Sequence, residues 1–146
     1  MGREFPARVA RILLVEDDPQ DVEITRRAFD RAKIGNSITV VTDGESALER
    51  LTTTRGDVDD RFDMVLLDLG LPKMDGRTLL REIYSDKRLR HIPVVVLTGS
   101  NDENDLINAY KGGAVAFLRK PVNVDRLLNA IGDLHGYRLY IARYED

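Results

Sequence analysis

Cysteine is absent from this chain of 146 residues. Disulfide bonds, thiolate metal sites and a cysteine nucleophile are therefore excluded, and the composition fits a reducing compartment. No apolar run approaches the roughly 18 residues that cross a membrane, and residues 1–6 lack the apolar segment of a secretory signal. The net charge of −3 gives no basic excess that would favour nucleic acid. We therefore expect a cytoplasmic protein that binds neither DNA nor membrane.

The overall composition is that of an ordinary soluble domain, with 42% hydrophobic and 32% charged residues. A chain of this length suits one domain with one core. We expect residues 1–8 to form a loosely held lead-in, residues 9–135 to form the domain, and residues 136–146 to form a C-terminal extension.

Short apolar runs alternate along the chain with segments of helical periodicity. Each run is bounded by turn residues, which is typical of fully buried strands. The expected strands span residues 12–15, 38–41, 64–67, 93–97 and 115–118. The expected helices begin near Asp18-Pro19, Asp43-Gly44, Arg77, Asn101-Asp102 and Asn123. This alternation predicts an α/β fold with a parallel sheet that is covered on both faces.

Two connections between these elements carry signals of their own. Gly35-Asn36 is expected to stop the first helix, which would reach about Lys33. The polar stretch from Thr52 to Phe62 is expected to be a surface loop.

Polar residues follow four of the expected strands. They are Glu16-Asp17-Asp18 after the first strand, Asp68 after the third, Thr98 after the fourth and Lys120 after the fifth. Each is ordinary when taken singly, because acids cap helices, aspartate forms turns and lysine is usually solvated. The carboxyl ends of parallel strands share one edge, however, and open α/β sheets bind their ligands there. If these strands are neighbours, the polar residues converge on one cleft.

The residue types at this edge suit phosphoryl chemistry. Carboxylates from two strands provide the oxygen ligands that a hard cation such as Mg²⁺ prefers. The cation and the ammonium of Lys120 would neutralise an incoming phosphoryl group, and the hydroxyl of Thr98 can donate to one of its oxygens. A carboxylate that the metal does not consume would be the nucleophile, and Asp68 is the candidate.

Four segments, in this order, resemble the receiver domain of two-component response regulators. They are ILLVEDD at 12–18, LLDLGLPKMDG at 66–76, VVLTGS at 95–100 and FLRKP at 117–121. The resemblance runs from about Arg11 to Leu134. It implies a flavodoxin-like (CheY-like) three-layer sandwich, with a five-stranded parallel sheet of order 2-1-3-4-5 and a C-terminal extension.

The resemblance also implies a metal site around the phosphoacceptor. Asp68 would accept the phosphoryl group, and Glu16 and Asp17 would organise Mg²⁺. Asp17 and Asp68 would be direct ligands, while Glu16 would act through water. The backbone carbonyl of Gly70 would complete the protein ligands.

A second group of residues is implied to stabilise and transmit phosphorylation. Thr98 and Lys120 would contact the phosphoryl group, and the bond between Lys120 and Pro121 would be cis. Inward movement of Thr98 would leave space that the side chain of Phe117 turns to fill. Many family members have tyrosine at this position, so a switch with Phe117 would depend on packing alone. The chain is expected to be a phosphoacceptor that assists its own phosphorylation and dephosphorylation, and not an enzyme.

The implied partners are proteins. A histidine kinase or a histidine phosphotransfer protein would supply the phosphoryl group, and a downstream protein would bind the altered surface. No output domain follows the last helix, which predicts a stand-alone regulator. The long polar loop before the third strand and the extended tail resemble regulators that are paired with bacterial phytochromes, so the kinase could be of the phytochrome type.

The tail carries an apolar stripe at helical spacing, formed by Tyr137, Tyr140, Ile141 and Tyr144. Such a stripe indicates either a helical extension packed on its own domain or a surface for a partner. We hypothesise a homodimer through the last helix and this tail.

Other functional classes make different demands on the sequence. A Mg²⁺-dependent phosphohydrolase of the haloacid dehalogenase type could use Asp68 as nucleophile. Such an enzyme requires a second acid two residues after the nucleophile, where this sequence has Gly70, and it also requires a cap domain. A nucleotide-binding module would need a glycine-rich loop where Glu16-Asp17-Asp18 follows the first strand. A binding module that is never phosphorylated would have no need of the acidic pair, Thr98 or Lys120.

Overall fold

The computed structural model describes residues 10–31, 34–53, 62–69, 76–99, 113–114, 116–123, 125–127 and 142–143. Within these ranges, strands and helices alternate in the order that the sequence predicts. None of the described helices is long and apolar enough to cross a membrane.

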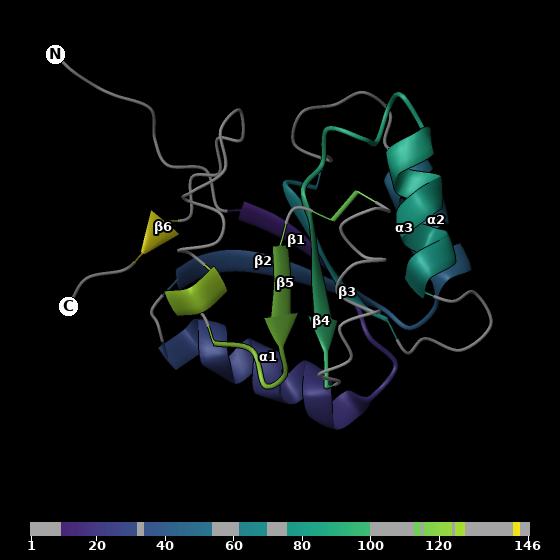
Figure 1. The fold of residues 1–146 in the computed structure, drawn as a ribbon. Helices are drawn as coiled ribbons and strands as arrows, with labels where there is room; N and C mark the ends of the chain where they lie inside the picture. The colour runs from purple at the N-terminus through teal and green to yellow at the C-terminus, as the bar shows by residue number, and fades with distance from the viewer. Residues whose placement is uncertain are drawn as a thin grey trace, which may run out of the picture.

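The strands form a six-stranded sheet (Figure 1). They are β1 (Ala10–Val15), β2 (Ile34–Val41), β3 (Met64–Asp68), β4 (Val94–Thr98), β5 (Ala116–Arg119) and β6 (Ala142–Arg143). Their order across the sheet is β5-β4-β3-β1-β2-β6, and the first five strands pair in parallel. This arrangement confirms the predicted parallel sheet of order 2-1-3-4-5.

The helices lie on both faces of the sheet (Figure 1). α1 (Pro19–Arg31) covers one face, and α2 (Gly44–Thr52) and α3 (Gly76–Ser85) lie together on the other. Residues 125–127 are also helical. The helix that the sequence predicts from Asn101-Asp102 lies outside the described residues.

Aspartate and asparagine side chains begin the helices where the sequence predicts them. The Asp18 carboxylate accepts a hydrogen bond from the Gln20 N–H at 2.9 Å, directly before α1. The Asp43 carboxylate accepts one from the Ser46 N–H at 2.7 Å and caps α2. The side chain of Asn123 accepts one from the Arg126 N–H at 3.1 Å. These bonds satisfy N–H groups that have no partner inside the helix, and so they fix where each chain segment leaves the sheet edge.

Each central strand contributes side chains to two separate cores, because successive residues of a strand point to opposite faces. On the α1 face, Ile12 and Leu14 pack in a cluster with Phe29. On the other face, Leu13 and Val15 pack in a cluster with the inward residues of α2 and α3, which are Ala47, Leu51, Leu79, Leu80 and Ile83. β3 and β4 are buried at every position. Rigid strands therefore present the residues at their carboxyl ends.

Two predictions about connections were wrong. Gly35 and Asn36 do not stop the first helix, which ends at Arg31; they lie in β2, where Asn36 pairs with Ala10. Strand pairing outweighs the turn preference of these two residues because it satisfies their backbone groups.

Phe62 does not belong to a surface loop, since it is buried at 5% exposure. Its ring lies against the α2–α3 core, and the guanidinium carbon of Arg11 lies 5.0 Å from the ring centroid. Residues 54–61 of the expected loop lie outside the described residues.

The tail is a strand, not a helix, at the two positions that the structure describes. Residues 142–143 form β6, which pairs antiparallel with β2 through Ile34↔Arg143 and Gly35↔Ala142 (Figure 1). Without β6, the outer side of β2 would be a sheet edge with backbone groups available for pairing. The spacing of apolar residues in the tail cannot reveal this edge, because β2 lies far away in the sequence.

The glycine at the start of α3 lets this helix approach the end of β3. A Cβ atom at Gly76 would lie 2.7 Å from the Cα of Leu69 and 2.8 Å from the carbonyl oxygen of Asp68. Both are backbone atoms, so they could not move aside without displacing the end of the strand.

We predict that Gly76→Ala lowers the free energy of unfolding by about 1–3 kcal/mol, because the added methyl group overlaps this backbone. Urea unfolding of the variant and wild type would measure it. Gly99→Ala is the matched control, since no described atom lies within 4 Å of its Cβ position. Equal losses in both variants would contradict the proposed contact.

Candidate functional site

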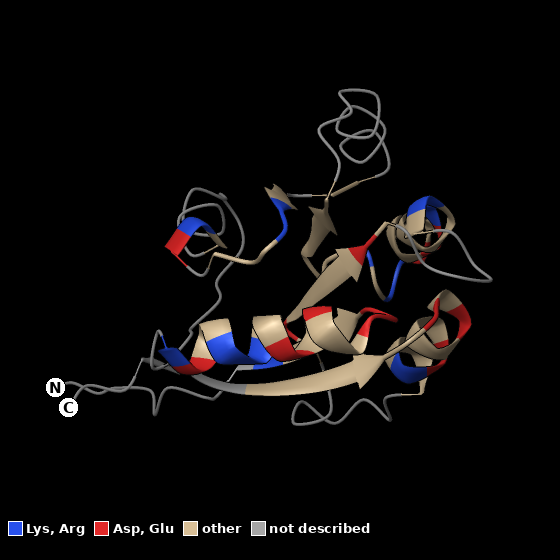
Figure 2. Ribbon diagram, turned by 90° about the horizontal axis from the view of Figure 1, so that it is seen from below, with Lys and Arg blue, Asp and Glu red and all other residues tan. Residues whose placement is uncertain are grey.

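The parallel registers bring the carboxyl ends of β1, β3, β4 and β5 to one edge of the sheet. Val15 pairs with Leu67, Asp68 with Leu97, and Thr98 with Arg119. The residues that directly follow or end these strands are therefore neighbours, as the sequence predicts. Figure 2 shows acidic segments gathered where β1 runs into α1.

Glu16, Asp17 and Asp68 form an acidic cluster at this edge. One carboxylate oxygen from each residue lies within 4.8 Å of the others. Glu16 and Asp68 are buried, whereas Asp17 is exposed. Oxygen donors from short, rigid segments suit a hard divalent cation. The cluster thus fits the divalent metal site that the sequence indicates.

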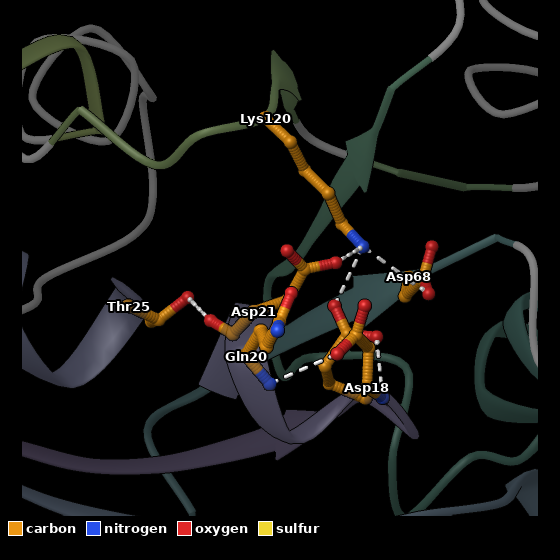
Figure 3. Close-up of polar contacts among 7 residues, drawn as sticks. Asp18, Gln20, Asp21, Thr25, Asp68 and Lys120 are labelled. Atoms are coloured by element: carbon orange, nitrogen blue, oxygen red, sulfur yellow. Dashed lines mark hydrogen bonds and ion pairs between the residues drawn. The ribbon is translucent and has the colours of Figure 1, made fainter. Parts of the chain in front are cut away.

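Lys120 extends from the end of β5 into the acidic cluster (Figure 3). Its Nζ atom lies 2.6 Å from Oε1 of Glu16, 2.8 Å from Oδ2 of Asp21 and 3.3 Å from Oδ2 of Asp68. The backbone N–H of Lys120 donates to the carbonyl of Thr98 at 2.7 Å, and this bond holds the backbone of Lys120 beside the end of β4. The peptide bond between Lys120 and Pro121 is cis, as expected.

Charge and burial act against each other in this site. Burial raises the pKa of Glu16 to about 7; the hydrogen bond from Lys120 opposes the rise, while the hydrogen bond and the charge of Asp68 add to it. Burial also disfavours the charged form of Lys120, but hydrogen bonds to Asp21 and Glu16 and the charge of Asp68 raise its pKa overall. Lys120 therefore stays positively charged, and Glu16 is poised to exchange its proton near neutral pH.

The remaining predicted residues have different positions. Thr98 ends β4 and is 5% exposed, next to the acidic cluster in the sheet. Phe117 is partly buried and packs against the core on the α2–α3 face. Gly70, the expected source of a carbonyl ligand, lies outside the described residues.

Asp21 is a site residue that the sequence predictions missed. It lies in the first turn of α1, 99 positions before its partner Lys120. An acid in the first turn of a helix is explained by the helix dipole alone, so no local signal in the sequence points from Asp21 to Lys120.

Comparisons with known sequences identify related proteins. A model of the response regulator receiver domain family matches residues 12–132. The probable methanogenesis regulatory protein FilR2 of Methanothrix harundinacea is 40% identical over 128 residues, which cover 88% of this chain and 83% of FilR2. The response regulator Rcp1 of Synechocystis is 35% identical over 130 residues, which cover 88% of each chain.

Solved structures give the same result. The bacteriophytochrome response regulator AtBRR has a TM-score of 0.79 and 39% identity, and the match covers 95% of this chain and 99% of AtBRR. The Mn²⁺-bound form of Rcp1 has a TM-score of 0.69 and 32% identity, with 93% and 99% covered. A relative of the same fold therefore binds a divalent cation.

We predict that divalent-cation binding strengthens as the pH rises from 6 to 8. Glu16 binds a proton below its pKa of about 7, and a cation favours the ionised carboxylate, so binding releases a proton in the acidic part of this range. One such group gives an affinity about tenfold higher at pH 8 than at pH 6. Titration calorimetry with Mg²⁺ or Mn²⁺, in buffers of different ionisation enthalpy, would measure both the affinity and the protons released.

Glu16→Gln should bind the cation more weakly and lose this pH dependence, because the amide does not titrate. Glu23→Gln is a control, since Glu23 is exposed on α1 and pairs with Arg27. An affinity that is independent of pH in the wild-type protein would contradict the role of Glu16.

Proposed function

This chain belongs to the response regulator receiver domain family, and we propose that it signals by accepting a phosphoryl group on Asp68. One observation carries the proposal. The carboxylate of Asp68 ends β3 within the oxygen cluster of Glu16 and Asp17, and it lies 3.3 Å from the ammonium of Lys120. The donor is the phosphohistidine of a histidine kinase or of a histidine phosphotransfer protein.

The transfer exchanges one bond to phosphorus for another. A carboxylate oxygen of Asp68 forms the new bond, and the bond between phosphorus and the imidazole nitrogen of the donor breaks. The electron pair of the broken bond returns to the imidazole. An ionised carboxylate has a lone pair ready for this step, so no general base has to remove a proton from Asp68.

Charge stabilisation is the main task of the surrounding residues, because phosphoryl transfer spreads negative charge over three oxygens. Lys120 turns an N–H group from a carboxylate toward a phosphoryl oxygen. Thr98, at the end of the neighbouring strand, donates its hydroxyl hydrogen to another. The same groups assist the later loss of the phosphoryl group to water, so the protein takes part in its own phosphorylation and dephosphorylation.

Mg²⁺ is the cation that we propose for the acidic cluster. Asp17 and Asp68 would hold it directly, with the carbonyl of Gly70 as a third ligand and Glu16 acting through water. When bound, it neutralises charge on the phosphoryl oxygens. The ligand type supports this choice, because Mg²⁺ is commonly held by one or two carboxylates and keeps several waters.

The output of phosphorylation is a changed protein-binding surface. Attraction of Thr98 toward the phosphoryl group alters the packing beside β4, and Phe117 on β5 turns inward to fill the space. The partly buried position of Phe117 supports this role, since it borders the core without being locked inside it. Phosphorylation shifts the equilibrium by as much as it favours one arrangement over the other.

The partners in this proposal are a cytoplasmic kinase and a downstream protein. The likeness to AtBRR, a bacteriophytochrome response regulator, supports a kinase of the phytochrome type. We also propose that the chain forms a homodimer through its last helix and tail. The apolar stripe of the tail supports this proposal. At residues 142–143 the tail pairs with β2 of its own chain.

We predict that the wild-type protein gains one phosphoryl group when it is incubated with Mg²⁺ and acetyl phosphate, as measured by intact mass. Asp68→Asn removes the nucleophilic oxygen and should gain none. Lys120→Ala keeps Asp68 but loses a charge-stabilising group, so its labelling should slow by roughly a hundredfold. Asp30→Asn, an exposed change on α1, should label like wild type. Equal labelling of wild type and Asp68→Asn would refute the proposal.

We further predict a dimer in sedimentation velocity at tens of micromolar protein, a range typical of modest interfaces. A chain ending at residue 135 should sediment as a monomer, because it lacks the apolar side chains of the tail. The homodimer is ruled out if the full chain is monomeric at all concentrations, both with and without phosphorylation.

A further inference from the structure

The ammonium group of Lys120 has three N–H donors and three carboxylates around it. Two of these, Glu16 and Asp68, belong to the acidic cluster at the strand ends. The third, Asp21, comes from α1, and in the view of Figure 3 it lies across the ammonium from Asp68. The ammonium is 2.8 Å from Asp21 and 3.3 Å from Asp68, so it is held closer to the helix than to the phosphoacceptor.

The backbone of Asp21 is held within the first turn of α1. The hydroxyl of Thr25, which is buried at 3% exposure, donates to the Asp21 carbonyl at 2.9 Å. An acid in the first turn of a helix also complements the helix dipole. That role needs no particular partner. The Asp21 carboxylate, however, accepts a hydrogen bond from Lys120, which follows β5, a strand separated from β1 by β3 and β4. Asp21 therefore acts on the site as well as on the helix.

The three carboxylates differ in how readily they can release the lysine. The side chain of Glu16 is 2% exposed and that of Asp68 is 12% exposed, whereas that of Asp21 is 31% exposed. Water can replace the ammonium at Asp21, but hardly at Glu16, where an unpaired buried carboxylate is costly. A phosphoryl oxygen on Asp68 that draws the ammonium closer than the present 3.3 Å will therefore lengthen the contact with Asp21 before the contact with Glu16.

We propose that Asp21 is a positioning residue that competes with the phosphorylated Asp68 for Lys120. Asp21 holds the ammonium on the α1 side in the resting site, and phosphorylation must overcome this hold. The inference rests on the proposed function of Asp68 and adds a regulatory element to it. Its consequence is that Asp21 limits how fast, and how fully, the site is phosphorylated.

Asp21→Asn keeps the shape of the side chain and replaces the charged carboxylate acceptor with a neutral amide oxygen, so the ion pair with Lys120 becomes a weaker hydrogen bond. We expect phosphorylation by acetyl phosphate at saturating Mg²⁺ to become faster by on the order of threefold to tenfold. Asp21→Glu restores the carboxylate and should bring the rate back toward wild type. Glu23→Gln removes a charge from the same helix two residues away and should leave the rate unchanged.

A double-mutant cycle separates this effect from a general change in helix stability or charge. In a Lys120→Ala background, Asp21→Asn should change the slow rate by less than about twofold, because the competed group is gone. A rate increase of the same size in both backgrounds would overturn the inference. So would a slower rate in Asp21→Asn alone.

The ammonium itself gives a readout that does not need phosphorylation. Nuclear magnetic resonance of ¹⁵N-lysine should detect a Lys120 ammonium that exchanges its hydrogens slowly with water, and Asp21→Asn should speed this exchange and shift the signal. An unchanged signal in Asp21→Asn would refute the hold on Lys120, whatever the labelling result. A wild-type protein that gains no phosphoryl group would refute the proposed function of Asp68, and with it the competition between Asp21 and phosphorylated Asp68. If the signal still changes in Asp21→Asn, the contact between Asp21 and Lys120 is confirmed independently.

Discussion

The contact between the Lys120 ammonium and the carboxylates at the sheet edge is the interaction on which the site depends. Buried carboxylates are costly unless a positive charge and hydrogen bonds compensate them, and Lys120 provides both to Glu16 and Asp68. The compensation is incomplete, because burial and the neighbouring carboxylate still raise the pKa of Glu16 to about 7. A site with this residual negative charge attracts further positive charge, which explains why a divalent cation suits it.

The sheet makes this crowding of like charges possible. Parallel pairing aligns the carboxyl ends of β1, β3, β4 and β5, and the two apolar cores hold the strands in register. The approach of α3 to the end of β3 at Gly76 and the hydrogen bond from Lys120 to Thr98 then fix the segments that leave the edge. The free energy that keeps the carboxylates together thus comes from apolar packing elsewhere in the domain.

In the proposed function, the same geometry would join phosphorylation of Asp68 to a change in packing. Asp68 and Thr98 end adjacent strands, and Lys120 is tied to Thr98 through the backbone, so a new charge on Asp68 acts on β4 and β5 together. Asp21 ties Lys120 to α1, which gives the resting arrangement a stability of its own. In this proposal, the site has two states because Asp21 and the phosphorylated Asp68 compete for one lysine.

Sequence patterns predicted most of the fold and the gathering of polar residues at one sheet edge, because buried strands and helix caps are local signals. The apolar run before Asp68 predicted β3, and Asp43 predicted the start of α2. Failures came where pairing partners lie far away in sequence: Gly35-Asn36 joined a strand, and Ala142–Arg143 paired with that strand instead of continuing a helical stripe.

By itself, then, the sequence determined the order of the elements and the polar residue types at the ends of the strands. Only the tertiary structure decided the charge balance, since no local pattern brings Asp21 to Lys120 across 99 positions.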